Sequence, residues 1–271
     1  MRNLISKKTS KIILLVISII LLIAIIIGTF FWNKYINKYT ALKAFETPKS
    51  QQIYFLGTMH DDHFNKLLNY SIQDVQNVIE NINPDIVFIE SREKYFNEYN
   101  VIDGPIEMSI VYSYCSENSI KVELVDYWEV DEKYLSKNDE DNKAARDDKI
   151  FSNIIEKLNS VDNNSRVLII YGRGHTDAQS NRFMGNGFRE MKIHNIKEIF
   201  TNNSKFLYPK TVTDTWEKRA YFYAYTLPDI VQNTPGLPDE IKNQFIGGNK
   251  EAFYLQQMEY SKIFLANELF K

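Results

Sequence analysis

The first apolar segment of the chain is long, continuous and free of charge. Residues 12–32 have the sequence IILLVISIILLIAIIIGTFFW, without an acidic or basic side chain. About 20 such residues in a helix span the hydrocarbon core of a bilayer. A signal peptide has a shorter apolar region of about 7–15 residues and a small-residue cleavage site, and this segment has neither. The pattern therefore predicts an uncleaved transmembrane anchor.

The charges around this segment predict its orientation. Four basic residues and no acidic residue precede it, namely Arg2, Lys7, Lys8 and Lys11. Because positively charged flanks stay in the cytoplasm, we expect residues 1–11 to form a cytoplasmic tail. The rest of the chain would then lie outside the cell membrane, as the C-terminal part of a single-pass protein. Residues 33–51 are mostly polar and are expected to form a stalk.

From residue 52 onward, short apolar runs alternate with amphipathic segments. The runs rich in β-branched and aromatic residues predict strands at 53–56, 85–90, 120–126 and 166–172, with a fifth at 196–200. Apolar residues at helical spacing predict helices over 71–82, 104–118 and 144–158. This alternation is typical of βαβ units. We expect residues 52–205 to form an α/β core with a mostly parallel central sheet and helices on both faces.

The pattern changes in the last part of the chain. Residues 215–232 and 249–270 have helical spacing with aromatic side chains along one face. An aromatic stripe is more often part of a core than a ligand site. We therefore expect residues 206–271 to be a helical extension that packs on the α/β core or covers it.

Composition excludes some classes of partner and site. The chain has 32 basic residues, of which four precede the apolar segment, and 35 acidic residues, all of which follow it. An acidic exterior domain does not attract nucleic acid, so no nucleic-acid partner is expected. The single Cys115 excludes an internal disulfide and a cysteine-based zinc site, and its surroundings predict a buried thiol.

Reactive side chains follow four of the expected strands. Gly57-Thr58-Met59-His60 follows the first strand and Gly172-Arg173-Gly174-His175 the fourth, so the spacing Gly-x-x-His occurs twice. The other two strand ends carry Glu90 with Arg92, and Asp126. The carboxyl ends of parallel strands share one edge of the sheet, where open α/β folds bind ligands. We expect the glycines to form tight turns that bring both histidines into one cleft.

Two imidazoles and one carboxylate are typical of an open site for a divalent transition metal. His60, His175 and Glu90 are therefore the candidate ligands, and Glu90 is also a candidate general base. The residues that would support such a site are Gly57, Asp61, Arg92, Asp126, Gly172 and Gly174. Simpler interpretations remain open, in which Glu90 only pairs with Arg92 and each histidine only stabilises a turn or a helix end.

The motifs resemble those of the TIKI superfamily, which includes TraB/PrgY-like, GumN-like and ChaN-related proteins. The resemblance covers about residues 52–200 and rests on the two Gly-x-x-His motifs, on PDIVFIE, which ends at Glu90, and on ARDDKIFSNIIEKL. It implies a metal-dependent protease that uses manganese or cobalt. It also implies that His60, Glu90 and His175 form the active centre, with Arg146 as a supporting polar group.

The preferred hypothesis is a membrane-anchored extracytoplasmic hydrolase that uses a divalent transition metal. The expected metal is manganese or cobalt, with zinc as an alternative. Its expected partners are a peptide or protein substrate and the lipid bilayer, and Arg146 or Arg173 would stabilise the oxyanion. The main alternative is a non-catalytic protein of the same fold that binds a peptide signal or haem. Two further alternatives are a metal-free hydrolase with a histidine as general base and a scaffold without any ligand.

Overall fold

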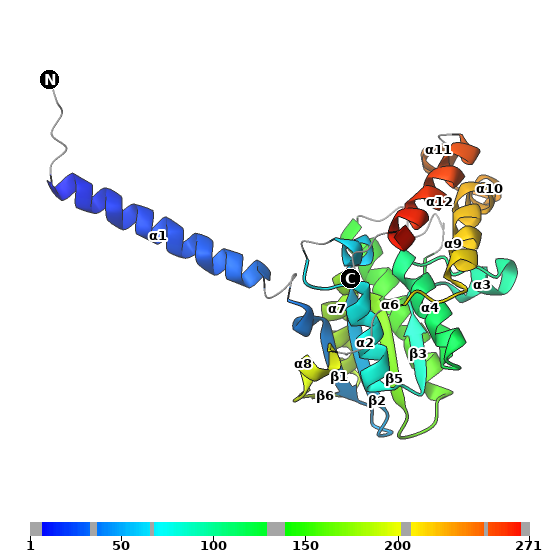
Figure 1. The fold of residues 1–271 in the computed structure, drawn as a ribbon, viewed down its shortest axis with the longest axis horizontal. Coiled ribbons are helices and arrows are strands. Elements are labelled where there is room, and N and C mark those ends of the chain that lie inside the picture. Colours follow the sequence, from blue (N-terminus) through cyan, green and yellow to red (C-terminus); the bar gives the residue numbers. More distant parts are fainter. Residues whose placement is uncertain are drawn as a thin grey trace.

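The computed structural model describes residues 7–32, 37–65, 68–128, 139–201, 207–246 and 249–266. The first element, helix α1 (Lys7–Phe31), stands apart from the rest of the chain in Figure 1. The stretch Lys11–Thr29 is long and apolar enough to cross a membrane, and none of it is buried inside the protein. By length and composition, α1 is therefore compatible with a membrane anchor or a signal sequence.

A six-stranded sheet forms the centre of the remaining chain (Figure 1). Its strands are β1 (Leu42–Glu46), β2 (Gln52–Thr58), β3 (Ile86–Ile89), β4 (Lys121–Leu124), β5 (Arg166–Gly172) and β6 (Arg189–Met191). Their order across the sheet is β4-β3-β5-β2-β1-β6. Strands β2, β3, β4 and β5 run parallel to one another, whereas β1 is antiparallel to both β2 and β6. The prediction of an α/β fold with a mostly parallel sheet is confirmed.

Strand β1 lies within residues 33–51, which were predicted to form a polar stalk. This prediction is wrong for residues 38–46, because they form the short helix η2 (Lys38–Ala41) and β1. The chain reverses after β1 in a turn in which the Thr47 amide donates to the Gln51 carbonyl at 3.0 Å. Strand β1 buries three apolar side chains, those of Leu42, Ala44 and Phe45. Lys43 and Glu46 interrupt this apolar pattern, which concealed the strand in the sequence.

The prediction of a fifth strand at 196–200 is also wrong, because this segment contains the short helix α8 (Ile196–Ile199). The carbonyl oxygens of Ile199 and Thr201 accept hydrogen bonds from the Asn81 side chain, each at 3.0 Å. The backbone therefore finds partners here without pairing with a strand. A short apolar run does not by itself distinguish a strand from a helical turn.

The strand side chains contribute to two hydrophobic clusters. Along β5, Leu168 and Ile170 belong to one cluster, whereas Val167, Ile169 and Tyr171 belong to the other. This alternation follows because successive side chains of a strand point to opposite faces of the sheet. The first cluster includes residues of α2 (Ile72–Ile82) and α4 (Ile106–Glu117), and the second includes residues of α6 (Asp139–Asn159) and α7 (Thr176–Gly185).

Local sequence signals explain where these helices begin and end. Helix α2 begins with a capping box between Ser71 and Asp74 and ends at Asn83, which is in the left-handed conformation directly before Pro84. Helix α4 begins after Pro105, as predicted, and its Cys115 is fully buried. Helix α6 includes the whole of the predicted segment 144–158.

The C-terminal part is helical, as the pattern predicted. It consists of α9 (Val212–Tyr221), a π-helical turn η5 (Phe222–Thr226), α10 (Leu227–Asn233), α11 (Asp239–Ile246) and α12 (Lys250–Ala266). Helix α9 packs on α4, where the buried Trp216 indole donates to the Ile106 carbonyl at 3.2 Å. Figure 1 shows these helices together at one end of the sheet, above the carboxyl ends of β3 and β5. They therefore lie near the strand ends that carry the candidate site.

Candidate functional site

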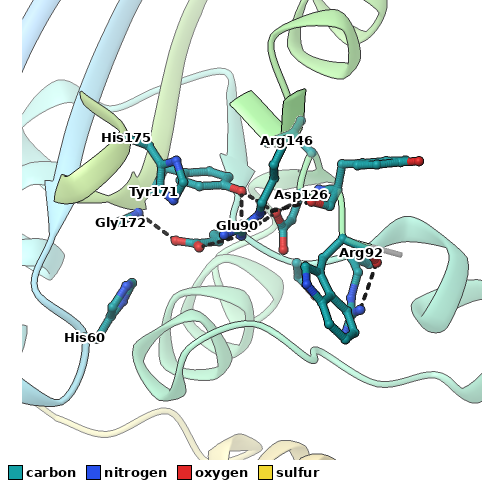
Figure 2. Close-up of polar contacts among 12 residues, drawn as sticks. His60, Glu90, Arg92, Asp126, Arg146, Tyr171, Gly172 and His175 are labelled. Carbon is teal, nitrogen blue, oxygen red and sulfur yellow. Dashed lines mark hydrogen bonds and ion pairs between the residues drawn. The ribbon is translucent and has the colours of Figure 1, made fainter. Parts of the chain in front are cut away.

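The two Gly-x-x-His motifs lie side by side at the carboxyl ends of adjacent strands. Strands β2 and β5 pair in parallel, with Thr58 opposite Gly172. His60 begins the short helix η3 (His60–Phe64), and His175 ends the short helix η4 (Arg173–His175). Figure 2 shows both imidazoles on one side of this rim, with the Glu90 carboxylate between them. The predicted convergence of His60, Glu90 and His175 is therefore present in the fold.

Each motif glycine provides space for the other motif. A Cβ atom on Gly172 would lie 2.9 Å from His60 Nε2 and 3.0 Å from Glu90 Oε2. A Cβ atom on Gly57 would lie 2.7 Å from Thr176 Oγ1 and 3.1 Å from the Arg173 Cα atom. The two turns therefore pack against each other, and a larger residue at either glycine would separate them.

This packing refines the role of the motif glycines, which were expected to form tight turns. None of Gly57, Gly172 and Gly174 has a positive φ angle. The residue that adopts the left-handed conformation is His60 itself, with φ 53°. A Cβ atom on Gly174 would meet nothing within 4 Å, so the structure gives no steric reason for that glycine. Close approach, rather than backbone freedom, explains the glycines at 57 and 172.

Each histidine is paired with a buried carboxylate from a helix. His60 Nδ1 lies 2.9 Å from Glu107 Oε1, and His175 Nδ1 lies 2.5 Å from Asp147 Oδ1. Glu107 is fully buried, and Asp147 is 3% exposed. In such pairs the Nδ1 atom carries the hydrogen bond, so the Nε2 atom of each imidazole is left for a ligand or a proton.

The electrostatics of His60 follow from its partner. Burial lowers the pKa of His60, but the hydrogen bond and charge of Glu107, with further contributions from Glu90 and Asp61, raise it to about 9. Burial raises the pKa of Glu107, but His60 outweighs this effect and holds that pKa below its ordinary value. In the part of the chain that the structure describes, Glu107 Oε2 has no hydrogen-bond partner.

Glu90 is the central carboxylate of the rim. Its Oε2 atom accepts a hydrogen bond from the Gly172 amide at 2.6 Å, and its Oε1 atom accepts one from Arg146 Nη2 at 3.3 Å. The residue is 4% exposed. Burial and the neighbouring Asp126 raise the pKa of Glu90, and the nearby cations and the Gly172 amide lower it, with a result of about 7.

Arg146 connects Glu90 to a second carboxylate. Its Nη2 atom also contacts Asp126 Oδ1 at 2.8 Å and the Tyr171 hydroxyl at 3.3 Å, and its Nε atom donates to the Tyr127 carbonyl at 3.0 Å. The Tyr171 hydroxyl donates to the same oxygen of Asp126 (Figure 2). Arg146 therefore contacts Glu90 directly, and Asp126 is connected to Glu90 through Arg146.

Other predicted residues have different partners. Arg92 is buried, pairs with Asp103 and stacks over the rings of Tyr95 and Trp128, so the alternative in which Glu90 only pairs with Arg92 is wrong. Arg146 is the cation that pairs with Glu90. The Arg92 side chain instead connects the segment that follows β3 to Asp103 and to the Trp128 carbonyl.

The remaining candidates lie around the first turn. Arg173 Nη2 donates to Thr40 Oγ1 at 2.5 Å and contacts the Asn37 carbonyl at 3.4 Å, which directs it to the segment before β1. Burial and a hydrogen bond to Asp61 raise the pKa of Tyr260, on α12, to about 12. The C-terminal extension thus reaches the turn that carries His60.

The most important side chain missed by the sequence analysis is Glu107. A glutamate in the first turn of a helix is an ordinary feature of soluble proteins. The available signal was its position among Ile106, Met108 and Ile110 in a helix with an apolar sequence, where a charged side chain requires a partner. The partner of His175, Asp147, lies next to Arg146 in the segment ARDDKIFSNIIEKL.

A pocket of about 380 Å³ lies beside Glu90 and is bordered on the far side by the C-terminal helices, through Arg219, Tyr223 and Leu227. Among the described residues, no three His, Cys, Asp or Glu side chains lie close enough to hold a metal ion as they stand. Comparisons with models of protein families, with curated proteins and with solved structures find no match to this chain.

Proposed function

We propose that this chain is a membrane-anchored hydrolase of peptides, with helices on both faces of its sheet and with its reactive centre at the joined ends of β2, β3 and β5. The observation that supports this proposal best is the arrangement of the two imidazoles. His60 and His175 each have Nδ1 bound to a buried carboxylate, and they flank the buried Glu90. The resemblance to the TIKI superfamily concerns the same three residues.

The chemistry of these side chains fits a divalent transition metal. In metal sites, a carboxylate commonly holds the Nδ1 atom of an imidazole and leaves Nε2 for the metal. The residues that would hold the metal are His60 and His175, with Glu90 either as a third ligand or as the base that activates the water. A bound metal of this kind lowers the pKa of a water molecule and polarises a carbonyl group.

The chain's own residues supply the remaining chemistry. Glu90, fixed by the Gly172 amide and by Arg146, accepts a proton from the attacking water and passes it to the leaving amine. The water oxygen bonds to the carbonyl carbon, and the carbon–nitrogen bond breaks. Arg146 offsets the negative charge that develops near the rim during this step.

We further propose that α1 anchors the protein, with its N-terminus in the cytoplasm and the sheet outside. The support is the uncharged apolar stretch of α1 and the basic residues before it. Protease added to intact cells that express the full chain should then digest the C-terminal part. Protection of that part until the membrane is permeabilised would contradict this orientation.

A metal-free hydrolase is the second candidate. It is favoured by the absence, among the described residues, of three potential ligands gathered at one point. In this version His175, held by Asp147, acts as the general base and Glu90 orients the water.

Turnover of a peptide library by the full chain in detergent micelles tests both candidates. Each reaction is run with manganese, cobalt or zinc, and again with a chelator, for the parent and for Glu90→Gln. Hydrolysis that the chelator abolishes supports the metal-dependent form, and hydrolysis that the chelator spares supports the metal-free form. Absence of hydrolysis under every condition contradicts both, and a haem-dependent absorbance band would then favour the haem-binding alternative. The variant Arg182→Gln, on the surface of α7, is the matched control.

A further inference from the structure

The pocket beside Glu90 is built jointly by the sheet rim and the C-terminal helices. Its volume is about 380 Å³, which is within the range of small-molecule sites and suits about one amino-acid residue. Its rim side carries Glu90 and Arg146, and its far side carries Arg219, Tyr223 and Leu227. The C-terminal extension therefore contributes directly to the space next to the reactive carboxylate.

A π-helical turn joins α9 to α10 at this wall. It contains Tyr223, whose hydroxyl donates to the Asp103 carbonyl. The Arg219 guanidinium lies over the Tyr223 ring, 4.8 Å from its centroid. Single π-helical turns inside α-helices are frequent at functional sites because they redirect side chains.

Three carboxylates and three guanidinium groups line the pocket, and they are not paired one to one. Asp103 pairs with Arg92, and Glu90 and Asp126 share Arg146. In the part of the chain that the structure describes, Arg219 forms no ion pair with a carboxylate. Its Nε atom instead donates to the Gly104 carbonyl at 2.7 Å, and its terminal N–H groups can donate to an anionic group.

Gly104 fixes Arg219 relative to Glu90. A Cβ atom on Gly104 would lie 1.8 Å from the Glu90 carbonyl oxygen, so the two backbone segments are in direct contact. Since Arg219 binds the carbonyl group of that same glycine, its position is tied to the end of β3. The Gly104 backbone therefore fixes the position of Arg219 relative to Glu90, and both residues line the same pocket.

We propose that Arg219 binds the terminal carboxylate of a peptide substrate, so that the hydrolase removes single residues from the C-terminus. This inference rests on the proposed function. The last residue of the peptide occupies the pocket, with its side chain against the apolar surfaces of Trp128 and Leu227. One water is added across the last amide bond, which releases a free amino acid and leaves the peptide one residue shorter.

The test compares binding of two probes that differ only in charge, N-acetyl-tyrosine and N-acetyl-tyrosinamide. Calorimetric titration of the full chain in micelles should show about tenfold or greater preference for the acid, as expected for a paired guanidinium and carboxylate. Arg219→Gln should remove this preference without changing amide binding, and Arg219→Lys should keep part of it. The matched control is Arg182→Gln, which removes an exposed arginine that pairs with Asp148.

Equal binding of the acid and the amide by the parent protein would overturn the inference, whether or not any variant folds. So would a preference that persists in a folded Arg219→Gln variant. A preference for the acid without peptide hydrolysis would leave the binding site standing and would contradict the proposed function. Equal hydrolysis of peptides with free and amidated C-termini would support the function and contradict the role of Arg219.

Discussion

The two histidine turns share one sequence spacing but differ in exposure and support. The His60 side chain is 45% exposed, and its partner Glu107 comes from α4. The His175 side chain is 12% exposed, and its partner Asp147 is also held by Gln179 from α7. We infer that His175 is the fixed half of the site and that His60 is the half that a ligand reaches from solvent.

Removing either imidazole should have the largest effect. We expect His60→Ala and His175→Ala each to lower hydrolysis by about a thousandfold, because each removes a reactive nitrogen beside Glu90. Added imidazole should restore activity to His60→Ala more than to His175→Ala, because the first cavity is open to solvent. Initial rates measured against imidazole concentration check this difference, and better rescue of His175→Ala would reverse the comparison.

The two glycines around Arg173 should differ strongly. Gly172→Ala forces a Cβ atom against His60 and Glu90, so we expect about a hundredfold loss of kcat/KM, as for other small displacements of reacting groups. Gly174→Ala meets no neighbouring atom and serves as the matched control, with activity close to the parent. Equal losses in the two variants would show that packing between the turns is not what Gly172 provides.

The two carboxylate partners should affect metal affinity. Glu107→Gln and Asp147→Asn are each expected to weaken binding by roughly 10–100-fold, the usual effect of removing the group that orients a ligating imidazole. The loss of metal affinity should be smaller for Asp147→Asn, because Gln179 still contacts the side chain at this position. Titration with manganese or cobalt measures both, with Asp148→Asn as the exposed control. A larger loss at 147 would contradict the view that His175 has the stronger support.

The smallest expected effect concerns stability. Gly57→Ala places a Cβ atom against Thr176 Oγ1 and the Arg173 backbone, and we expect it to lower the free energy of unfolding by about 1–3 kcal/mol. Thr176→Ala removes one of these contacts, so the double variant should recover part of the loss. Urea unfolding of the four proteins gives the coupling energy. If the changes in unfolding free energy of the two single variants are strictly additive, the two turns are not in steric contact at these residues.

Much of the fold followed from local pattern, and the exceptions have physical reasons. The apolar runs at 53–56 and 166–172 predicted strands, because each is continuous and contains β-branched or aromatic residues. Strand β1 was missed because the charged residues Lys43 and Glu46 interrupt its apolar positions. Helix α8 was mistaken for a strand because its carbonyl groups are satisfied by Asn81, which lies far away in the sequence.

The candidate site could be predicted where reactive side chains come directly after the ends of strands. His60, Glu90 and His175 could be selected because parallel strands place their carboxyl ends on one edge. Glu107 could not be selected, since its role depends on how α4 packs against the first turn. The same limit applies to Arg219, which reaches the pocket only through the docking of α9.

The central claim is that the two turns form one metal-dependent centre with Glu90. The most direct test is the metal content of the full chain in micelles, measured by plasma mass spectrometry after loading with manganese, cobalt or zinc. We expect about one ion per chain in the parent and in Gly174→Ala, and almost none in His60→Ala or His175→Ala. A parent without bound metal, or a histidine variant that retains it, would contradict the claim.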